Sequence, residues 1–244
     1  MPPRIPTAAD FSSLSSSLPH TIHFPSPPES TTAILLLFHG LGDSHAPFAS
    51  FARAVNLPGV LAISIRGTSP LPAALGADGT HWGDDLSLDS TTGDMDADPG
   101  FKKATKAIMD KLVIGVLVDK CGWEVDDVMC FGFGQGGSLA LGIAADIAGT
   151  RVTEASRPRQ NRLKGVVSIG GPLPPSMVST ISGREKSKTP VCLVQVDDGD
   201  ADYAKREFAD VKSVKWKRSE VDMPRNRDEM FPIMKFFADC LATH

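Results

Sequence analysis

Apolar residues in this chain gather in short continuous runs, and several stretches between these runs carry apolar positions at helical spacing. Apolar runs of about four to eight residues without polar alternation are typical of strands that are covered on both faces of a parallel sheet. They predict strands over residues 31–38, 60–65, 128–133, 166–169 and 191–196, and a weaker last strand over residues 211–216.

Helical patterns lie between these strands. In residues 101–120 the apolar residues Ala104, Ile108 and Leu112 share one helical face, and Gly122 follows as a stop signal. Further helices are expected over residues 47–55, 138–148 and 228–241. Strands that alternate with helices predict an α/β fold with a mostly parallel central sheet and helices on both faces.

Two segments do not fit this alternation. Residues 1–20 are rich in Ser and Pro, and we expect them to form a surface arm ahead of a single α/β domain over residues 21–244. Residues 66–100 have few apolar positions and many Gly, Pro and Asp residues. Long excursions of this kind are usually functional loops, and the sequence leaves open whether residues 81–100 form a lid.

Composition narrows the class of protein. The 244 residues include 25 Lys and Arg against 29 Asp and Glu, a formal charge of −4, which argues against a nucleic-acid binder that works through bulk positive charge. No apolar run approaches the ~20 residues of a transmembrane helix, and the N-terminus lacks the apolar stretch of a signal peptide. The four cysteines have no C-x-x-C spacing, so we expect buried free thiols and a cytoplasmic protein.

Two glycine-rich turns follow predicted strands. The run over residues 31–38 leads into HGLGDS (residues 39–44), and the run over residues 128–133 leads into GFGQGG (residues 132–137) and a helix. Glycines around such a strand-to-helix turn permit an abrupt reversal that holds one residue on a strained elbow, close to the N–H groups of the helix N-terminus. In hydrolases a loop after an earlier strand supplies a second N–H, so the two turns together indicate a site for an acyl oxygen.

On these motifs, the chain resembles the acyl-protein thioesterase and carboxylesterase (phospholipase/carboxylesterase) family of α/β-hydrolases, and it looks like a fungal member. The similarity covers about residues 31–241 and implies the α/β-hydrolase fold. Further matching segments are Arg66-Gly67, Trp82-x-Asp84, DGDAD (residues 198–202) and Glu229-Met230.

The resemblance also shows what this chain lacks. Family members carry the nucleophilic Ser between Phe and Gln, where this sequence has Gly134. The family's His lies six residues before the Glu-Met pair, where this sequence has Met223, and Asp202 is the counterpart of the triad acid. Acyl transfer needs a nucleophile, a base and a group that orients the base. The resemblance therefore predicts a pseudoenzyme with a degenerate triad.

An oxyanion-type pocket does not depend on those side chains. The resemblance implies that backbone N–H groups of Leu41 and Gln135 supply its donors, and that the pocket holds a small acyl-type ligand or a protein partner. The expected pocket residues are His39, Gly40, Leu41, Gly42, Asp43, Trp82 and Gln135. No cofactor or metal is expected, because the run Asp94-x-Asp96-x-Asp98 lacks the Gly and Glu of a calcium loop.

Other interpretations remain open. An atypical ester or thioester hydrolase could use His81 or bound water, whereas Ser138, a Ser44–His45 dyad and Cys130 are weaker candidates. A scaffold subunit without a small ligand is a further alternative. The basic residues over 149–164 form either a solvated loop or a docking patch for an acidic partner; they are Arg151, Arg157, Arg159, Arg162 and Lys164.

Overall fold

The computed structural model describes residues 3–72, 79–86, 96, 98–149, 161–181 and 183–242. Its strands are β1 (His20–His23), β2 (Ala33–Phe38), β3 (Val60–Ile65), β4 (Ser69–Pro70), β5 (Thr80–His81), β6 (Val128–Phe133), β7 (Gly165–Ile169), β8 (Val191–Val194) and β9 (Val211–Val214). Its longer helices are α1 (His45–Val55), α2 (Lys102–Lys106), the π-helix η4 (Ala107–Val118), α3 (Gln135–Gly149), α4 (Asp198–Glu207) and α5 (Arg227–Ala242). Short 3-10 turns are η1 (Ala8–Leu14), η2 (Pro28–Ser30), η5 (Val125–Asp127) and η6 (Pro175–Met177).

The central sheet, as far as the described residues show it, has seven strands in the order β1-β3-β2-β6-β7-β8-β9. Strands β3 to β9 in this order pair in parallel, and β1 is antiparallel to β3. The mostly parallel sheet that the apolar runs predict is therefore confirmed. The antiparallel β1 was not predicted, because its half-buried sequence HTIH has no apolar run.

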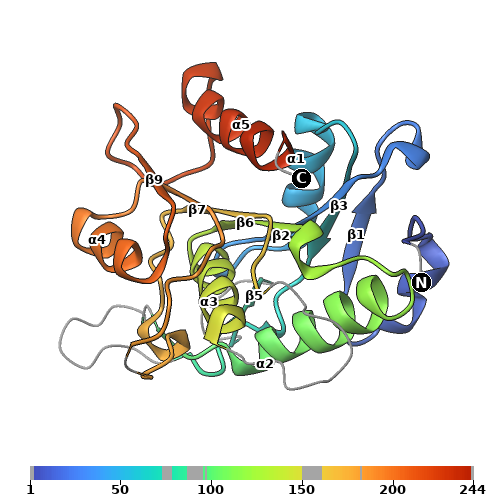
Figure 1. The fold of residues 1–244 in the computed structure, drawn as a ribbon, viewed down its shortest axis with the longest axis horizontal. Coiled ribbons are helices and arrows are strands. Elements are labelled where there is room, and N and C mark those ends of the chain that lie inside the picture. The colour runs from blue at the N-terminus through green and yellow to red at the C-terminus, as the bar shows by residue number, and fades with distance from the viewer. Residues whose placement is uncertain are drawn as a thin grey trace.

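Helices cover both faces of this sheet (Figure 1), with α1 and α5 on one side and α2, η4 and α3 on the other. Alternate residues of a strand point to opposite faces. Ile34 and Leu36 of β2 accordingly belong to the apolar cluster beneath α3 and η4, whereas Leu35 and Leu37 belong to the cluster beneath α1 and α5. Both faces are buried, which explains why polar alternation is missing from these runs.

The strand order places a topological switch point at the end of β2. The chain passes from β2 to β3 on one side and later returns as β6 on the other side of β2. Such a switch point opens a space outside the carboxyl ends of the two central strands. HGLGDS and GFGQGG both begin there, so topology brings two segments about ninety residues apart in sequence to one place.

Residues 1–20 were expected to form a surface arm, but apolar side chains of this segment are buried in the core. Phe11, Leu14 and Leu18 are buried in the core cluster beside η4. The carboxylate of Asp10 pairs with Arg4 at 2.6 Å, and Trp123 Nε1 donates to the Arg4 carbonyl. Single apolar residues among Ser and Pro gave no periodic pattern, and tertiary contacts decide their burial.

Two further differences concern loops. Residues 198–202, for which no helix was predicted, begin helix α4. Asp198 and Asp200 in its first turn interact favourably with the positive end of the helix dipole. Much of the excursion over residues 66–100 lies outside the described residues, so the question of a lid stays open. Among the described helices, none combines the length and apolar character that a bilayer span requires.

Candidate functional site

The residue at the elbow is Gly134, between the end of β6 and the start of α3. Its φ is +50°, in the left-handed region. The Gly134 N–H donates to the Ile169 carbonyl of β7 at 2.8 Å, and the Gly134 carbonyl accepts from Gly137 and Ser138 N–H groups. The sharp turn of a nucleophile elbow is thus present, with glycine at its apex.

The other glycines of this turn are required by close packing. A Cβ on Gly136 would lie 2.4 Å from the Phe38 carbonyl oxygen, and one on Gly132 would lie 2.2 Å from the Gly136 carbonyl oxygen. At Gly134 the nearest atom to such a Cβ is Gly40 Cα, at 4.0 Å. A side chain would therefore fit at Gly134, although the positive φ would strain it.

The loop HGLGD is held against the elbow by strand β5. The Gly42 N–H donates to the Thr80 carbonyl, and the Thr80 N–H donates to the Asp43 carbonyl, each at 3.0 Å. Leu41 at the loop tip is exposed. Among the described residues, neither the Leu41 nor the Gln135 amide N–H donates a hydrogen bond.

His39 has a structural role in this loop. It is fully buried; its Nε2 accepts the Gly67 N–H at 2.8 Å, so Nδ1 carries the proton and donates to the Gly40 carbonyl at 2.7 Å. Burial lowers the pKa of His39 and keeps the imidazole neutral. With both ring nitrogens engaged, this side chain is not free to act as a general base.

Trp82 joins the two turns. Its backbone N–H donates to Gln135 Oε1 and its indole Nε1 donates to the His39 carbonyl, both at 2.8 Å. The indole is fully buried and packs edge-on against Phe38. His39, Trp82 and Gln135, expected together from their motifs, are thus brought into one network.

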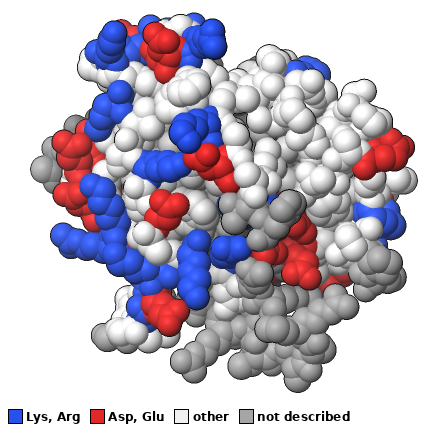
Figure 2. Space-filling model, turned by 45° about the horizontal axis from the view of Figure 1, so that its top comes forward, with Lys and Arg blue, Asp and Glu red and all other residues white. Residues whose placement is uncertain are grey.

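Asp202 does not join them. It lies on helix α4 with its side chain 65% exposed, and its carboxylate pairs with Lys205 one turn later at 2.8 Å. This pairing lowers the pKa of Asp202. Figure 2 shows Lys and Arg mixed with Asp and Glu on the side of the molecule that carries α4 and β9 in Figure 1. The Asp202 carboxylate is thus solvated and paired within its own helix.

Met223 lies in the loop between β9 and α5 and packs against the apolar cluster beneath α1 and α5. The loop is held by Arg218, whose Nη2 donates to the Met223 carbonyl at 2.9 Å. The same guanidinium forms a two-point ion pair with the buried carboxylate of Glu229, at 2.9 and 3.2 Å, and lowers the pKa of that carboxylate. Sequence reasoning noted Glu229 only as part of a motif and missed Arg218, since nothing local pairs two residues eleven positions apart.

The weaker nucleophile and base candidates are not assembled into a catalytic unit. Ser138 is buried on α3, and burial raises the pKa of the Cys130 thiol. His45 Nδ1 is buried and has no hydrogen-bond partner in the described structure, so it makes no Ser44–His45 dyad. His81 is buried, burial lowers its pKa, and its Nδ1 likewise has no partner among the described residues.

The charged runs are only partly described. Asp98 accepts hydrogen bonds from the N–H and hydroxyl of Ser176, whereas Asp94 lies outside the described residues. Of the basic run, Arg162 and Lys164 are described, and Arg151, Arg157 and Arg159 lie outside. In the described part of the chain, no group of three or more His, Cys, Asp or Glu residues is placed to hold a metal ion.

A sequence profile of the phospholipase/carboxylesterase family matches residues 21–203. The chain belongs to this family. A curated relative, an uncharacterized hydrolase of Schizosaccharomyces pombe, is 28% identical over 220 residues, covering 86% of this chain and 84% of the relative. An uncharacterized hydrolase of Mycosarcoma maydis is 29% identical over 162 residues, covering 65% of this chain and 54% of the relative.

Solved structures support the α/β-hydrolase fold of this family member. Zea mays acyl-protein thioesterase 2 matches 91% of this chain and 99% of its own, with a TM-score of 0.64 and 18% identity. Esterase PE8 matches 92% of this chain and 99% of its own, with a TM-score of 0.67 and 18% identity. At such identities the likeness concerns the fold.

Proposed function

We propose that this member of the phospholipase/carboxylesterase family is a pseudoenzyme that binds an acyl-type ligand without hydrolysing it. The observation that carries the proposal is Gly134 at the apex of the elbow, where the resemblance implies a nucleophilic serine. A glycine offers no oxygen to attack an ester, and loss of nucleophile or base alone costs such a unit on the order of a million-fold in turnover.

The other two triad positions support the same proposal. Met223 has a thioether that cannot take a proton near neutral pH, and its side chain packs with apolar neighbours. The carboxylate of Asp202 faces solvent and pairs with Lys205, so it has no imidazole to orient. Neither side chain is placed to take part in a catalytic proton transfer.

What the site retains is suited to binding. The N–H groups of Leu41 and Gln135 have no acceptor among the described residues. Together with the N-terminus of the fifteen-residue helix α3, they favour an acyl oxygen or a carboxylate. The exposed apolar side chains of Leu41 and Val221, the latter beside Gly170 at the end of β7, offer contacts to a hydrocarbon chain. A fatty acid, with one charged end and an apolar tail, matches these two properties.

Hydrolysis of p-nitrophenyl acetate and of an acyl thioester tests the first half of the proposal. We expect the wild-type chain to release product no faster than a boiled sample. Saturable turnover that disappears in Asp202→Asn would overturn the proposal. Turnover that survives Asp202→Asn but disappears in His81→Ala would favour the atypical hydrolase. Its supporting observation is the buried Nδ1 of His81, which has no hydrogen-bond partner among the described residues.

Binding of decanoate, followed by isothermal titration calorimetry, tests the second half. Leu41→Asp places a carboxylate beside the proposed donors and should weaken binding about tenfold or more through like-charge repulsion. Ile181→Asp makes the same change at an exposed apolar residue in the segment between η6 and β8 and should leave binding unchanged. Equal affinities of the wild type and Leu41→Asp, or no binding at all, would favour the scaffold alternative.

A further inference from the structure

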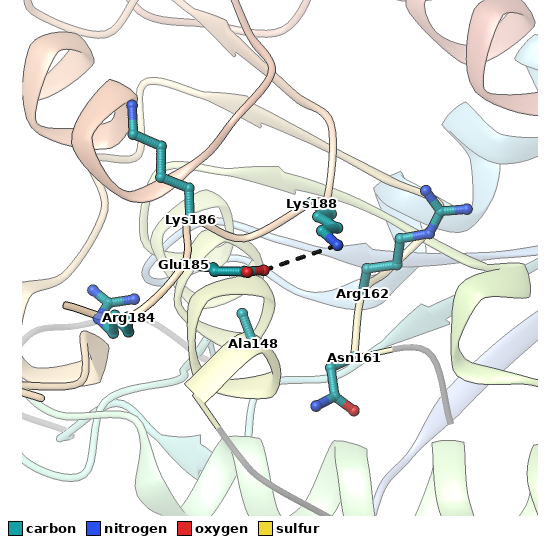
Figure 3. Close-up of a pocket in the computed structure, with 7 residues that line it drawn as sticks. All are labelled: Ala148, Asn161, Arg162, Arg184, Glu185, Lys186 and Lys188. Atoms are coloured by element: carbon teal, nitrogen blue, oxygen red, sulfur yellow. Dashed lines mark ion pairs between the residues drawn. The ribbon is translucent and has the colours of Figure 1, made fainter. Parts of the chain in front are cut away.

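A hollow of about 470 Å³ lies at the far end of α3 from the elbow. Its lining residues are Ala148, Asn161, Arg162, Arg184, Glu185, Lys186 and Lys188 (Figure 3). Asn161 and Arg162 precede β7, and Lys186 and Lys188 precede β8, so they lie at the edge of the parallel sheet opposite to the elbow. Helix α3 has fifteen residues, which separates the two places by roughly 22 Å. The hollow is therefore distinct from the acyl site.

Among the described residues that line this hollow, positive charge exceeds negative charge. They supply four cationic side chains and one carboxylate, that of Glu185. The Arg184 guanidinium already pairs with Glu207, and Lys186 Nζ donates to the Lys205 carbonyl. Lys188 approaches Glu185 only to 3.9 Å, and both side chains are mostly exposed. Such an exposed pair contributes little, so Lys188 can turn to another anion.

The guanidinium of Arg162 has a hydrogen-bond donor without an acceptor among the described residues. Its Nε is buried and has no acceptor within the described part of the chain. A buried donor without an acceptor costs about 1–3 kcal/mol, which an anion in contact with the guanidinium would recover. In Figure 3 Arg162 and Arg184 lie on opposite sides of the hollow, with Glu185 and Lys188 between them.

A second hollow, of about 550 Å³, also includes Arg162 in its lining. There Arg162 and Lys164 are accompanied by the carboxylates of Asp126 and Asp127, so the formal charges cancel. An anion is favoured in the hollow that Arg162 shares with Lys188, because positive charge exceeds negative charge there among the described lining residues.

We propose that the hollow around Arg162 and Lys188 binds the phosphate group of a small molecule. A phosphate carries up to two negative charges near neutral pH and presents several acceptor oxygens, which the planar guanidinium and the ammonium group can both contact. The volume lies in the range of small-molecule sites. This site is independent of the proposed acyl site and does not need hydrolytic activity.

Titration of the full chain with inorganic pyrophosphate at constant ionic strength tests this proposal by isothermal titration calorimetry. Arg162→Gln should weaken binding about tenfold or more, the loss expected when a charge-assisted hydrogen bond is removed. Lys188→Gln should have a smaller effect in the same direction. Lys217→Gln, which removes an exposed lysine elsewhere, is the matched control and should bind as the wild type does.

Arg162→Lys keeps the charge but loses the planar set of donors and should bind with an affinity between those of the wild type and Arg162→Gln. The urea midpoint of each variant checks that the fold is intact. No binding by the wild type, unchanged affinity in Arg162→Gln, wild-type affinity in Arg162→Lys, or an equal loss in Lys217→Gln would each overturn the proposal.

The source of the phosphate is tested in a separate arm. Vesicles of phosphatidylcholine that contain phosphatidylinositol 4-phosphate are compared with vesicles of phosphatidylcholine alone. We expect no Arg162-dependent binding to either, because a free small molecule is the proposed ligand. Arg162-dependent capture by the phosphoinositide vesicles alone would assign the site to a lipid headgroup and overturn the small-molecule source.

Discussion

The two turns at the ends of β2 and β6 differ from the region around α4 and the loop before α5 in how they are built. In the first region, the features come from the backbone: a left-handed apex at Gly134, a loop held by Thr80, and two amide N–H groups that have no acceptor among the described residues. In the second region, Asp202 is a surface residue and Met223 packs with apolar neighbours. Backbone N–H groups can bind an acyl oxygen whatever the side chains are, whereas acid–base chemistry needs particular side chains, and the proposed binding without turnover follows this difference.

The largest expected effect tests how rigid the first region is. Gly136→Ala should destabilise the protein by about 3 kcal/mol, because the added Cβ meets two backbone carbonyl oxygens at 2.4 and 2.5 Å that cannot move without shifting β2. Gly134→Ala should cost only about 1–2 kcal/mol, the penalty of a left-handed non-glycine residue. Urea unfolding curves measure both.

Gly183→Ala is the matched control for Gly134→Ala. Gly183 also has a positive φ, of +75°, and nothing within 4 Å of an added Cβ. The two variants should lose similar stability. If Gly136→Ala is as mild as these two, the close contacts of the elbow relax easily and the first region is less rigid than proposed.

A smaller loss of stability is expected when His39, which hydrogen-bonds within the loop HGLGD, is replaced. His39→Phe keeps a buried ring but removes the acceptor of the Gly67 N–H and the donor to the Gly40 carbonyl. The Gly40 carbonyl still accepts from the Asp43 N–H, but the buried Gly67 N–H is left without an acceptor, which should cost about 1–3 kcal/mol in urea unfolding. Decanoate affinity should fall as well, since the loop presents the Leu41 N–H; unchanged stability and affinity together would show that β5 alone holds the loop.

In the second region, the ion pair between Arg218 and Glu229 should make the stability of the protein depend on pH. Pairing lowers the pKa of Glu229 below its ordinary value of 4.5, so the contribution of the pair to stability is present at neutral pH and is lost as pH falls through the lowered pKa. Glu229→Gln should therefore lower the urea midpoint at pH 7, and its difference from the wild type should shrink on acidification. A difference that is independent of pH would contradict this assignment.

The smallest effect is expected at Asp202, the position that the family resemblance matches to the triad acid. Asp202→Asn removes an exposed charge whose partner is Lys205, so neither the urea midpoint at pH 7 nor decanoate affinity should change measurably. Glu229→Gln in the same assay serves as the comparison. A large loss in Asp202→Asn would show that this carboxylate is coupled to the site and would weaken the contrast between the two regions.

Much of this architecture could be predicted from local pattern. The expected strands over residues 60–65 and 128–133 agree with β3 and β6, and the expected helix over residues 228–241 lies within α5. These elements have strong apolar periodicity that persists in any context. Helix α4 was missed, because its polar sequence DGDADYAKRE carries little periodicity. The burial of Phe11 and Leu18 was missed for the same reason.

The amino-acid sequence by itself determined the alternation of strands and helices, the two glycine-rich turns and the identities of Gly134 and Met223, because all of these are local properties of the chain. Only the tertiary structure decided that Trp82 links the two turns, that Asp202 faces solvent, and that the buried Nε of Arg162 has no acceptor among the described residues. Hydrogen bonds and burial depend on contacts between segments that are distant in the sequence. The order of the strands in the sheet determines these contacts, and no local pattern encodes that order.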